Sequence, residues 1–166
     1  MTKPPQIKIK LNLFDKIIEA LGYITLIVFW LMTIVSFCSL PESIPLHYNA
    51  IGEADSYSQK TSIFLLPIIG TLLFTILTII NKSPENFNYN IKITEENALK
   101  QYIIATKMIR LLKVIVVAVF LMINYQTIQI AKENTSGLGI WFLPLVLSMI
   151  FIPVGYYTFK SYQLKK

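Results

Sequence analysis

Four apolar runs, each long enough to cross a bilayer as a helix, constrain this chain more than any other feature. Residues 63–80 contain no Asp, Glu, Lys or Arg, and similar runs occupy 20–40, 111–131 and 140–159. About 20 apolar residues in a helix span the hydrocarbon core of a membrane. Charged residues make up only 14% of the chain, against about 25% in a soluble domain. The sequence therefore predicts an all-α integral membrane protein, in which residues 1–166 form a single domain with four transmembrane helices.

Basic residues are distributed unevenly between the segments that join these runs. Lys60 and Lys132 lie in the first and third connections, and the other thirteen of the fifteen are Lys3, Lys8, Lys10, Lys16, Lys82, Lys92, Lys100, Lys107, Arg110, Lys113, Lys160, Lys165 and Lys166. Under the positive-inside rule this asymmetry predicts an N-in/C-in, multi-pass protein of a bacterial cytoplasmic (inner) membrane, with the 41–60 loop facing outward. The long side chains of Lys107, Arg110 and Lys113 are expected to reach lipid phosphates. Nucleic acid is not expected as a partner, because the charge lies beside apolar runs and not across a polar fold.

The segments on the cytoplasmic side carry local structural signals. Asn12 is a candidate N-cap of the first helix, and Thr94 is a candidate N-cap of a helix that runs to about Ala131. Apolar and polar residues alternate over residues 6–13 and again over 86–93. A period of two is typical of a strand. We therefore expect these two segments to pair as a small cytoplasmic two-stranded β-element.

The loop predicted to face outward is too rich in apolar and turn-forming residues to be a flexible linker. It contains two prolines and the only histidine, and residues 49–52 predict a turn with Gly52 at positive φ. The polar outer end of the third run lies on the same side of the membrane. We expect the loop and this helix end to form one outer pocket that binds a ligand or partner, from Pro45, His47, Asn49, Gly52, Glu53, Asp55, Asn124 and Gln126, with Gln129 nearby.

His47 has several alternative roles. The simplest is structural, in which the ring forms hydrogen bonds that hold the loop in shape. A metal site needs about three protein ligands, and His47, Glu53 and Asp55 are the candidates. A third role is a polar contact to an external ligand. The chain contains no H-E-x-x-H or G-x-S-x-G motif, so we expect neither an enzyme nor a cofactor.

Two runs of residues carry a resemblance to a known family. The first is Leu40-Pro41-x-x-Ile44-Pro45-x-His47-Tyr48-Asn49-x-x-Gly52-Glu53-x-Asp55, and the second is Phe87-Asn88-Tyr89-x-Ile91-Lys92-Ile93-Thr94-Glu95-Glu96-Asn97-Ala98, followed by Gln101-Tyr102. Together they resemble a bacterial membrane domain of unknown function that forms the N-terminal part of SdpI-type immunity proteins. Those proteins protect cells from a secreted sporulation-delay toxin and carry a further C-terminal membrane domain. Asn90 departs from the pattern, which has proline there.

The resemblance implies a membrane protein with an immunity-like role. Combined with the ordered outward loop, it favours a non-enzymatic protein that recognises an extracytoplasmic peptide, toxin or partner protein through residues 41–60. The alternative is a small transporter or metal-binding membrane protein that uses the pocket around His47. The lipid bilayer is the partner expected on either interpretation, and a secreted peptide or protein is the partner expected on the first.

Overall fold

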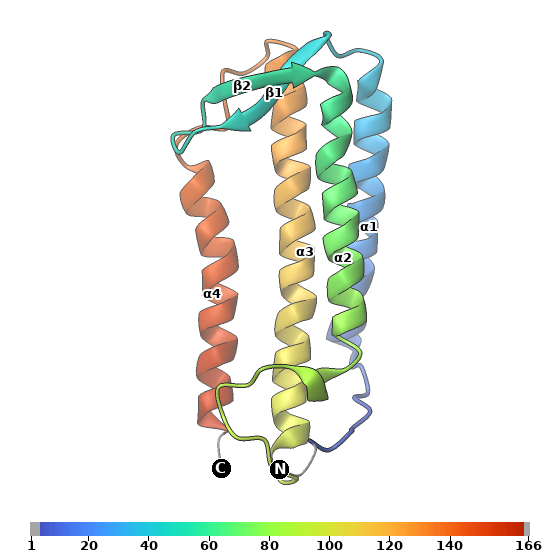
Figure 1. Cartoon of the computed structure of the whole chain (residues 1–166), viewed down its shortest axis with the longest axis vertical. Coiled ribbons are helices and arrows are strands. Elements are labelled where there is room, and N and C mark those ends of the chain that lie inside the picture. Colours follow the sequence, from blue (N-terminus) through green and yellow to red (C-terminus); the bar gives the residue numbers. More distant parts are fainter. Residues whose placement is uncertain (1–3, 165–166) are drawn as a thin grey trace.

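The computed structural model describes residues 4–164, which form a bundle of four helices with a β-hairpin at one end (Figure 1). Three of the basic residues used to predict the orientation, Lys3, Lys165 and Lys166, lie outside the described residues. The elements follow in the order α1 (Leu13–Phe37), β1 (Ser43–Tyr48), β2 (Ala54–Gln59), the 3-10 helix η1 (Lys60–Phe64), α2 (Leu65–Ile80), the 3-10 helix η2 (Pro84–Asn86), α3 (Ala98–Ala131) and α4 (Phe142–Gln163).

Three stretches of the described chain are helical, long and apolar enough to cross a membrane. They are Leu13–Phe37, Lys60–Ile80 and Phe142–Gln163, and they overlap three of the four predicted runs. The fourth run lies within α3, which has 34 residues and is therefore about 51 Å long. This helix lies in the middle of the bundle (Figure 1) and packs against α1, α2, α4 and β1.

The apolar core lies along α3 in two clusters. Phe29 of α1, Phe74 of α2 and Val117 of α3 meet inside the bundle. The second cluster lies beneath the hairpin and consists of Leu40, Ile44, Ile63 and Ile128. By contrast, α4 buries none of its residues and presents large apolar side chains such as Phe151 and Ile152 on its surface. An apolar outer face of this kind suits contact with lipid.

Asn12 caps the first helix as predicted, whereas the third helix begins later than predicted. The side chain of Asn12 accepts from the Asp15 amide at 2.8 Å, and the Asp15 carboxylate accepts from the Asn12 amide at 3.0 Å. At the other site, Thr94 and Asn97 exchange hydrogen bonds between side chain and backbone, and the helix proper starts at Ala98. Thr94 therefore caps a turn over residues 95–97 that precedes the helix.

The two-stranded sheet forms in the 41–60 loop and not at the predicted place. Strands β1 and β2 are antiparallel, with Ile44 opposite Ser58 and Pro45 opposite Tyr57. Within the described chain, residues 6–12 and 87–93 contain no strand, so the predicted pairing of 6–13 with 86–93 is wrong. A hairpin closes a short loop through one tight turn, which costs little entropy. The predicted pair would join segments separated by two helices and a loop. Closing that longer loop costs more entropy, and an alternating sequence alone does not compensate for it.

Candidate ligand-binding cavity beneath the hairpin

The turn of the hairpin is held by a single asparagine. The side-chain oxygen of Asn49 accepts from the amides of Ile51 at 3.1 Å and Glu53 at 3.0 Å. The backbone oxygen of Asn49 accepts from the Gly52 amide at 2.9 Å, and Gly52 has φ of 83°. The predicted turn with Gly52 at positive φ is confirmed.

Two contacts hold the hairpin across the ends of the helices. The hydroxyls of Tyr48 and Thr127 lie 2.8 Å apart, which joins β1 to α3. At the tip of the hairpin, the backbone oxygen of Gly52 accepts from the Leu138 amide at 2.7 Å, and Glu53 forms a β-bridge with Gly137. The hairpin thus reaches from the ends of α1 and α2 over α3 to the loop that leads into α4 (Figure 1).

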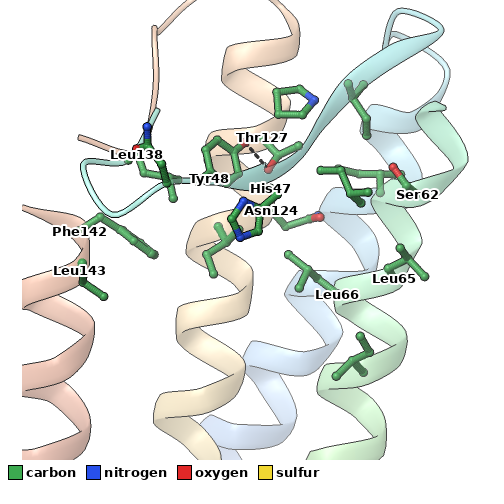
Figure 2. Close-up of a pocket in the computed structure, with 18 of the residues that line it drawn as sticks. His47, Tyr48, Ser62, Leu65, Leu66, Asn124, Thr127, Leu138, Phe142 and Leu143 are labelled. Carbon is green, nitrogen blue, oxygen red and sulfur yellow. Dashed lines mark hydrogen bonds between the residues drawn. The ribbon is translucent and has the colours of Figure 1, made fainter. Parts of the chain in front are cut away.

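A cavity of about 470 Å³ lies beneath this hairpin (Figure 2). The hairpin forms its roof, and residues of α2, α3 and α4 form its walls. The contribution of α4 comes from its first two residues, Phe142 and Leu143. The helical part of the lining is mainly apolar, from Leu65, Leu66, Ile69, Ile123, Phe142 and Leu143. The size and the apolar lining are those of a site for a small molecule or a few side chains of a peptide.

Asn124 places a fixed hydrogen-bond acceptor in the lining of this cavity. It is only 1% exposed, and its Nδ2 donates to Thr33 Oγ1 at 2.8 Å. The Thr33 hydroxyl already donates its one proton to the Phe29 carbonyl, so it can only accept from Asn124. This orients the Asn124 amide with Oδ1 away from Thr33, and among residues 4–164 that buried oxygen has no hydrogen-bond partner. An unmatched buried acceptor costs about 1–3 kcal/mol.

Neutral hydroxyls supply the other buried polar groups near the roof. Ser62 Oγ is buried without a hydrogen-bond partner among the described residues, and Ser62 lines the cavity. Burial raises the pKa of Tyr48, and its hydrogen bond to Thr127 acts in the opposite direction. Tyr48 therefore stays protonated at neutral pH, and these groups offer hydrogen bonds without charge.

The structure brings five of the eight predicted pocket residues into the lining of this cavity and leaves three outside it. The five are Pro45, His47, Asn49, Gly52 and Asn124. Outside the lining are Glu53, Asp55 and Gln126, the last of which lines a shallower depression beside Trp141 on α4. Gln129, expected nearby, bonds Asn134 in the loop that follows α3.

His47 pairs with Asp55 on the hairpin, with its Nδ1 2.6 Å from Asp55 Oδ1, although the histidine side chain is 69% exposed. Glu53 instead accepts from the Asn49 side chain at 3.2 Å. Within residues 4–164, no group of three His, Cys, Asp or Glu side chains is placed to hold a metal ion. The contact to Asp55 is the geometry that a structural role for His47 requires.

A buried network of charges, which the sequence analysis did not single out, joins α1 to α3 at the opposite end of the bundle. Arg110 donates from Nε to Glu19 at 2.9 Å and from Nη1 to Asp15 at 3.1 Å. Lys113 Nζ donates to Glu19 at 2.6 Å and to Thr78 at 2.9 Å. Asp15, Arg110 and Lys113 are at most 5% exposed. Two carboxylates therefore balance two cations inside the protein.

This network corrects the expectation for two of the three basic side chains of α3, Arg110 and Lys113, which do not point outward to lipid phosphates. Lys113 is fully buried and Arg110 nearly so, whereas Lys107 is half-buried. Unpaired charges are costly at membrane depth, so these cations face the bundle interior, where carboxylates are available. The sequence held a signal for this arrangement. Asp15 and Glu19 are four residues apart and therefore share a helix face, as Arg110 and Lys113 do at a spacing of three.

Comparison with known proteins finds a similarity that includes the hairpin and covers less than half of the chain. Residues 24–71 match the family model of a domain of unknown function, DUF1648. The match covers most of α1, the whole hairpin and the first turns of α2. An uncharacterized protein of Archaeoglobus fulgidus is 30% identical over 67 residues, which make up 40% of this chain and 37% of that protein. This chain thus matches well under half of that relative's length. No solved structure matches the chain.

Proposed function

We propose that this is a non-enzymatic membrane protein that recognises an extracytoplasmic peptide or protein partner at the cavity beneath the hairpin, in an immunity- or sensor-like role. In this proposal all four helices cross the membrane, both termini are cytoplasmic and the hairpin faces outward. The observation that carries it is a mostly apolar cavity whose lining includes Asn124, a residue whose buried side-chain oxygen is fixed in direction and has no partner among the described residues. A ligand with an N–H or O–H donor would satisfy it.

The chemistry of the cavity favours an apolar peptide segment as the ligand. Its lining is mostly apolar, and it combines one fixed acceptor with hydroxyls that can donate or accept. A peptide with apolar side chains fills such walls and supplies backbone amides to the acceptor. The resemblance to immunity proteins that act on a secreted toxin points to the same class of ligand.

A transporter receives less support from the geometry. Asn124 lies near the C-terminal end of α3 and the Arg110–Lys113 pair lies near its middle. Phe29, Phe74 and Val117 form an apolar layer between these two sites. Each of these three side chains is at most 3% exposed. A polar solute would have to cross this layer, and transport of such a solute would require the helices to separate.

The ligand proposal predicts that Asn124→Leu weakens binding of an apolar peptide about two- to tenfold, the equivalent of one lost hydrogen bond of ~0.5–1.5 kcal/mol. The probe is a capped leucine tripeptide amide, titrated into detergent-purified protein and followed by native mass spectrometry. Gln126→Leu is the matched control, because it makes the same exchange on the same helix outside this cavity. Equal affinity in both variants, or no saturable binding to the natural sequence, would count against peptide recognition here.

The proposed orientation predicts that a membrane-impermeant maleimide labels Cys38 in intact cells. Cys38 is the only cysteine of the chain, is exposed, and caps α1 at the hairpin end. The control is Cys38→Ser combined with Asn88→Cys, which moves the thiol to an exposed position at the other end of the bundle. This variant should react only after the cells are permeabilised. The reverse pattern would place the hairpin in the cytoplasm.

A further inference from the structure

A second cavity, of about 650 Å³, lies at the end of the bundle opposite the hairpin. Its walls come from the extended N-terminal segment, from the ends of α1 and α2, and from α3. Figure 1 shows the N-terminal segment and the connection between α2 and α3 together at this end. In the proposed orientation this is the inner membrane surface, so any ligand here differs from the one beneath the hairpin.

Arg110 provides the central polar group of this cavity. Its side chain is nearly buried, yet it belongs to the lining. Among the described residues it donates from Nε to Glu19 and from Nη1 to Asp15, which leaves Nη2 without a protein partner in that part of the chain. A guanidinium has five N–H donors in a fork that matches phosphate oxygens. The ion-pair network thus orients Arg110 and leaves donors for a ligand.

Two further cations lie on different walls of the cavity. Lys8 comes from the N-terminal segment and Lys82 from the connection that follows α2, and both residues are exposed. The ion pairs of Arg110 and Lys113 with Asp15 and Glu19 are neutral as a set, so Lys8 and Lys82 face one remaining carboxylate of the lining, Glu85. The lining therefore has a net positive charge, which favours an anion.

The same cavity has an apolar side. Ile7, Ile9 and Leu11 of the N-terminal segment and Pro84 of the α2–α3 connection belong to the lining. This alternation of lysine and isoleucine, which suggested a strand, instead gives a wall that carries both charge and apolar surface. A phosphate bound at the cations would leave the hydrocarbon part of an amphiphile beside these apolar groups.

We propose that this inner cavity binds the phosphate headgroup of an anionic phospholipid from the cytoplasmic leaflet. The phosphate lies between Arg110, Lys8 and Lys82, and the acyl chains leave past Ile9 and Leu11 into the bilayer. Arg110 thus reaches a lipid phosphate through the cavity and not from the outer surface of its helix. The chemistry recognised is a phosphate ester, and the membrane is its source.

The test is lipid titration of the detergent-purified full chain, followed by native mass spectrometry. Phosphatidylglycerol is expected to bind saturably and phosphatidylcholine more weakly, because only the former has a net negative charge. The double variant Lys8→Gln/Lys82→Gln should bind phosphatidylglycerol at least fivefold more weakly than the natural sequence. The control Lys92→Gln/Lys100→Gln removes the same charge from exposed residues at the same end, outside the lining, and should bind normally.

Three results would overturn the proposal. Equal weakening in the two double variants would mean that the lipid responds to total charge and not to this cavity. Equal affinity for both lipids would remove the role of the anionic headgroup. Displacement of the lipid by millimolar glycerol phosphate or inorganic phosphate would make a soluble phosphate the ligand. Retention of phosphatidylglycerol in the presence of both soluble anions is the result that supports the lipid.

Discussion

Replacing Arg110 with methionine is expected to lower the free energy of unfolding by about 3–5 kcal/mol, the usual cost of removing one partner of a buried ion pair. Asp15 is 4% exposed and would lose its cation, while Glu19 would keep only Lys113. Without Arg110, the buried Asp15 carboxylate either stays charged without water or a cation beside it, or takes up a proton. Both outcomes lower the free energy of unfolding. The measurement is unfolding by a denaturing detergent, followed by the loss of helical circular dichroism.

Two comparison variants isolate the effect of the charge. Lys107→Met removes a cation from the same helix one turn earlier, where the side chain is half-buried, and should change stability by less than about 1 kcal/mol. Adding Asp15→Asn to Arg110→Met removes the orphaned charge and keeps an oxygen for the Asn12 cap, so it should recover part of the loss. Equal effects of Arg110→Met and Lys107→Met would show that the network contributes little.

The length and periodicity of the apolar runs were sufficient to predict the helices. The predicted end of the third helix, at Ala131, is the end observed, and the cap at Asn12 is confirmed. Both features depend on local interactions, because the residues that cap or end a helix are close to that end in the sequence. Local rules also predicted the Asn49–Gly52 turn, because an αL residue at that position is most readily a glycine.

The strands could not be predicted in the same way, because their sequence does not alternate clearly. Residues 43–48 read Ser-Ile-Pro-Leu-His-Tyr, and Ile44 and Pro45 are both buried although they are neighbours. The register is irregular between Pro45 and His47, so the usual period of two is lost in β1, whereas burial alternates along β2. Contacts with η1 and α3 decide which side chains are buried here, and those contacts are tertiary.

The composition of the cavity beneath the hairpin could also be predicted only in part from the sequence. The predicted grouping of polar residues is partly correct, because His47 and Asn124 line a common cavity. The walls are nevertheless mostly apolar and come from helices that are apolar on several sides. The periodicity of such helices does not identify which side faces the cavity. What makes Asn124 distinctive is the direction of its amide, which follows from the hydrogen bond that Thr33 donates to Phe29. These two linked hydrogen bonds join residues of α1 and α3, so they can be identified only from the structure.

Replacing Gly52 with alanine is expected to detach the tip of the hairpin from the α3–α4 loop. Gly52 has φ of +83°, a conformation that costs an ordinary residue about 1–2 kcal/mol. A Cβ added here would lie 2.6 Å from the amide nitrogen of Gly139 and 2.7 Å from its carbonyl oxygen, so the two backbones must separate. The expected result is a destabilisation of about 2 kcal/mol or more and faster hydrogen exchange at the Leu138 amide, which donates to Gly52.

Gly155→Ala is the matched control, because it adds the same methyl group inside α4, where nothing lies within 4 Å of the new Cβ. Alanine is the better helix former by about 1 kcal/mol, so this variant should be as stable as the natural sequence or more stable. Its Leu138 amide should exchange at the normal rate. Because the hairpin tip forms part of the cavity roof, Gly52→Ala should also weaken binding of the capped tripeptide, while Gly155→Ala should not. Unchanged exchange at Leu138 in Gly52→Ala would show that the bridge between the hairpin and the α3–α4 loop does not hold the roof in place.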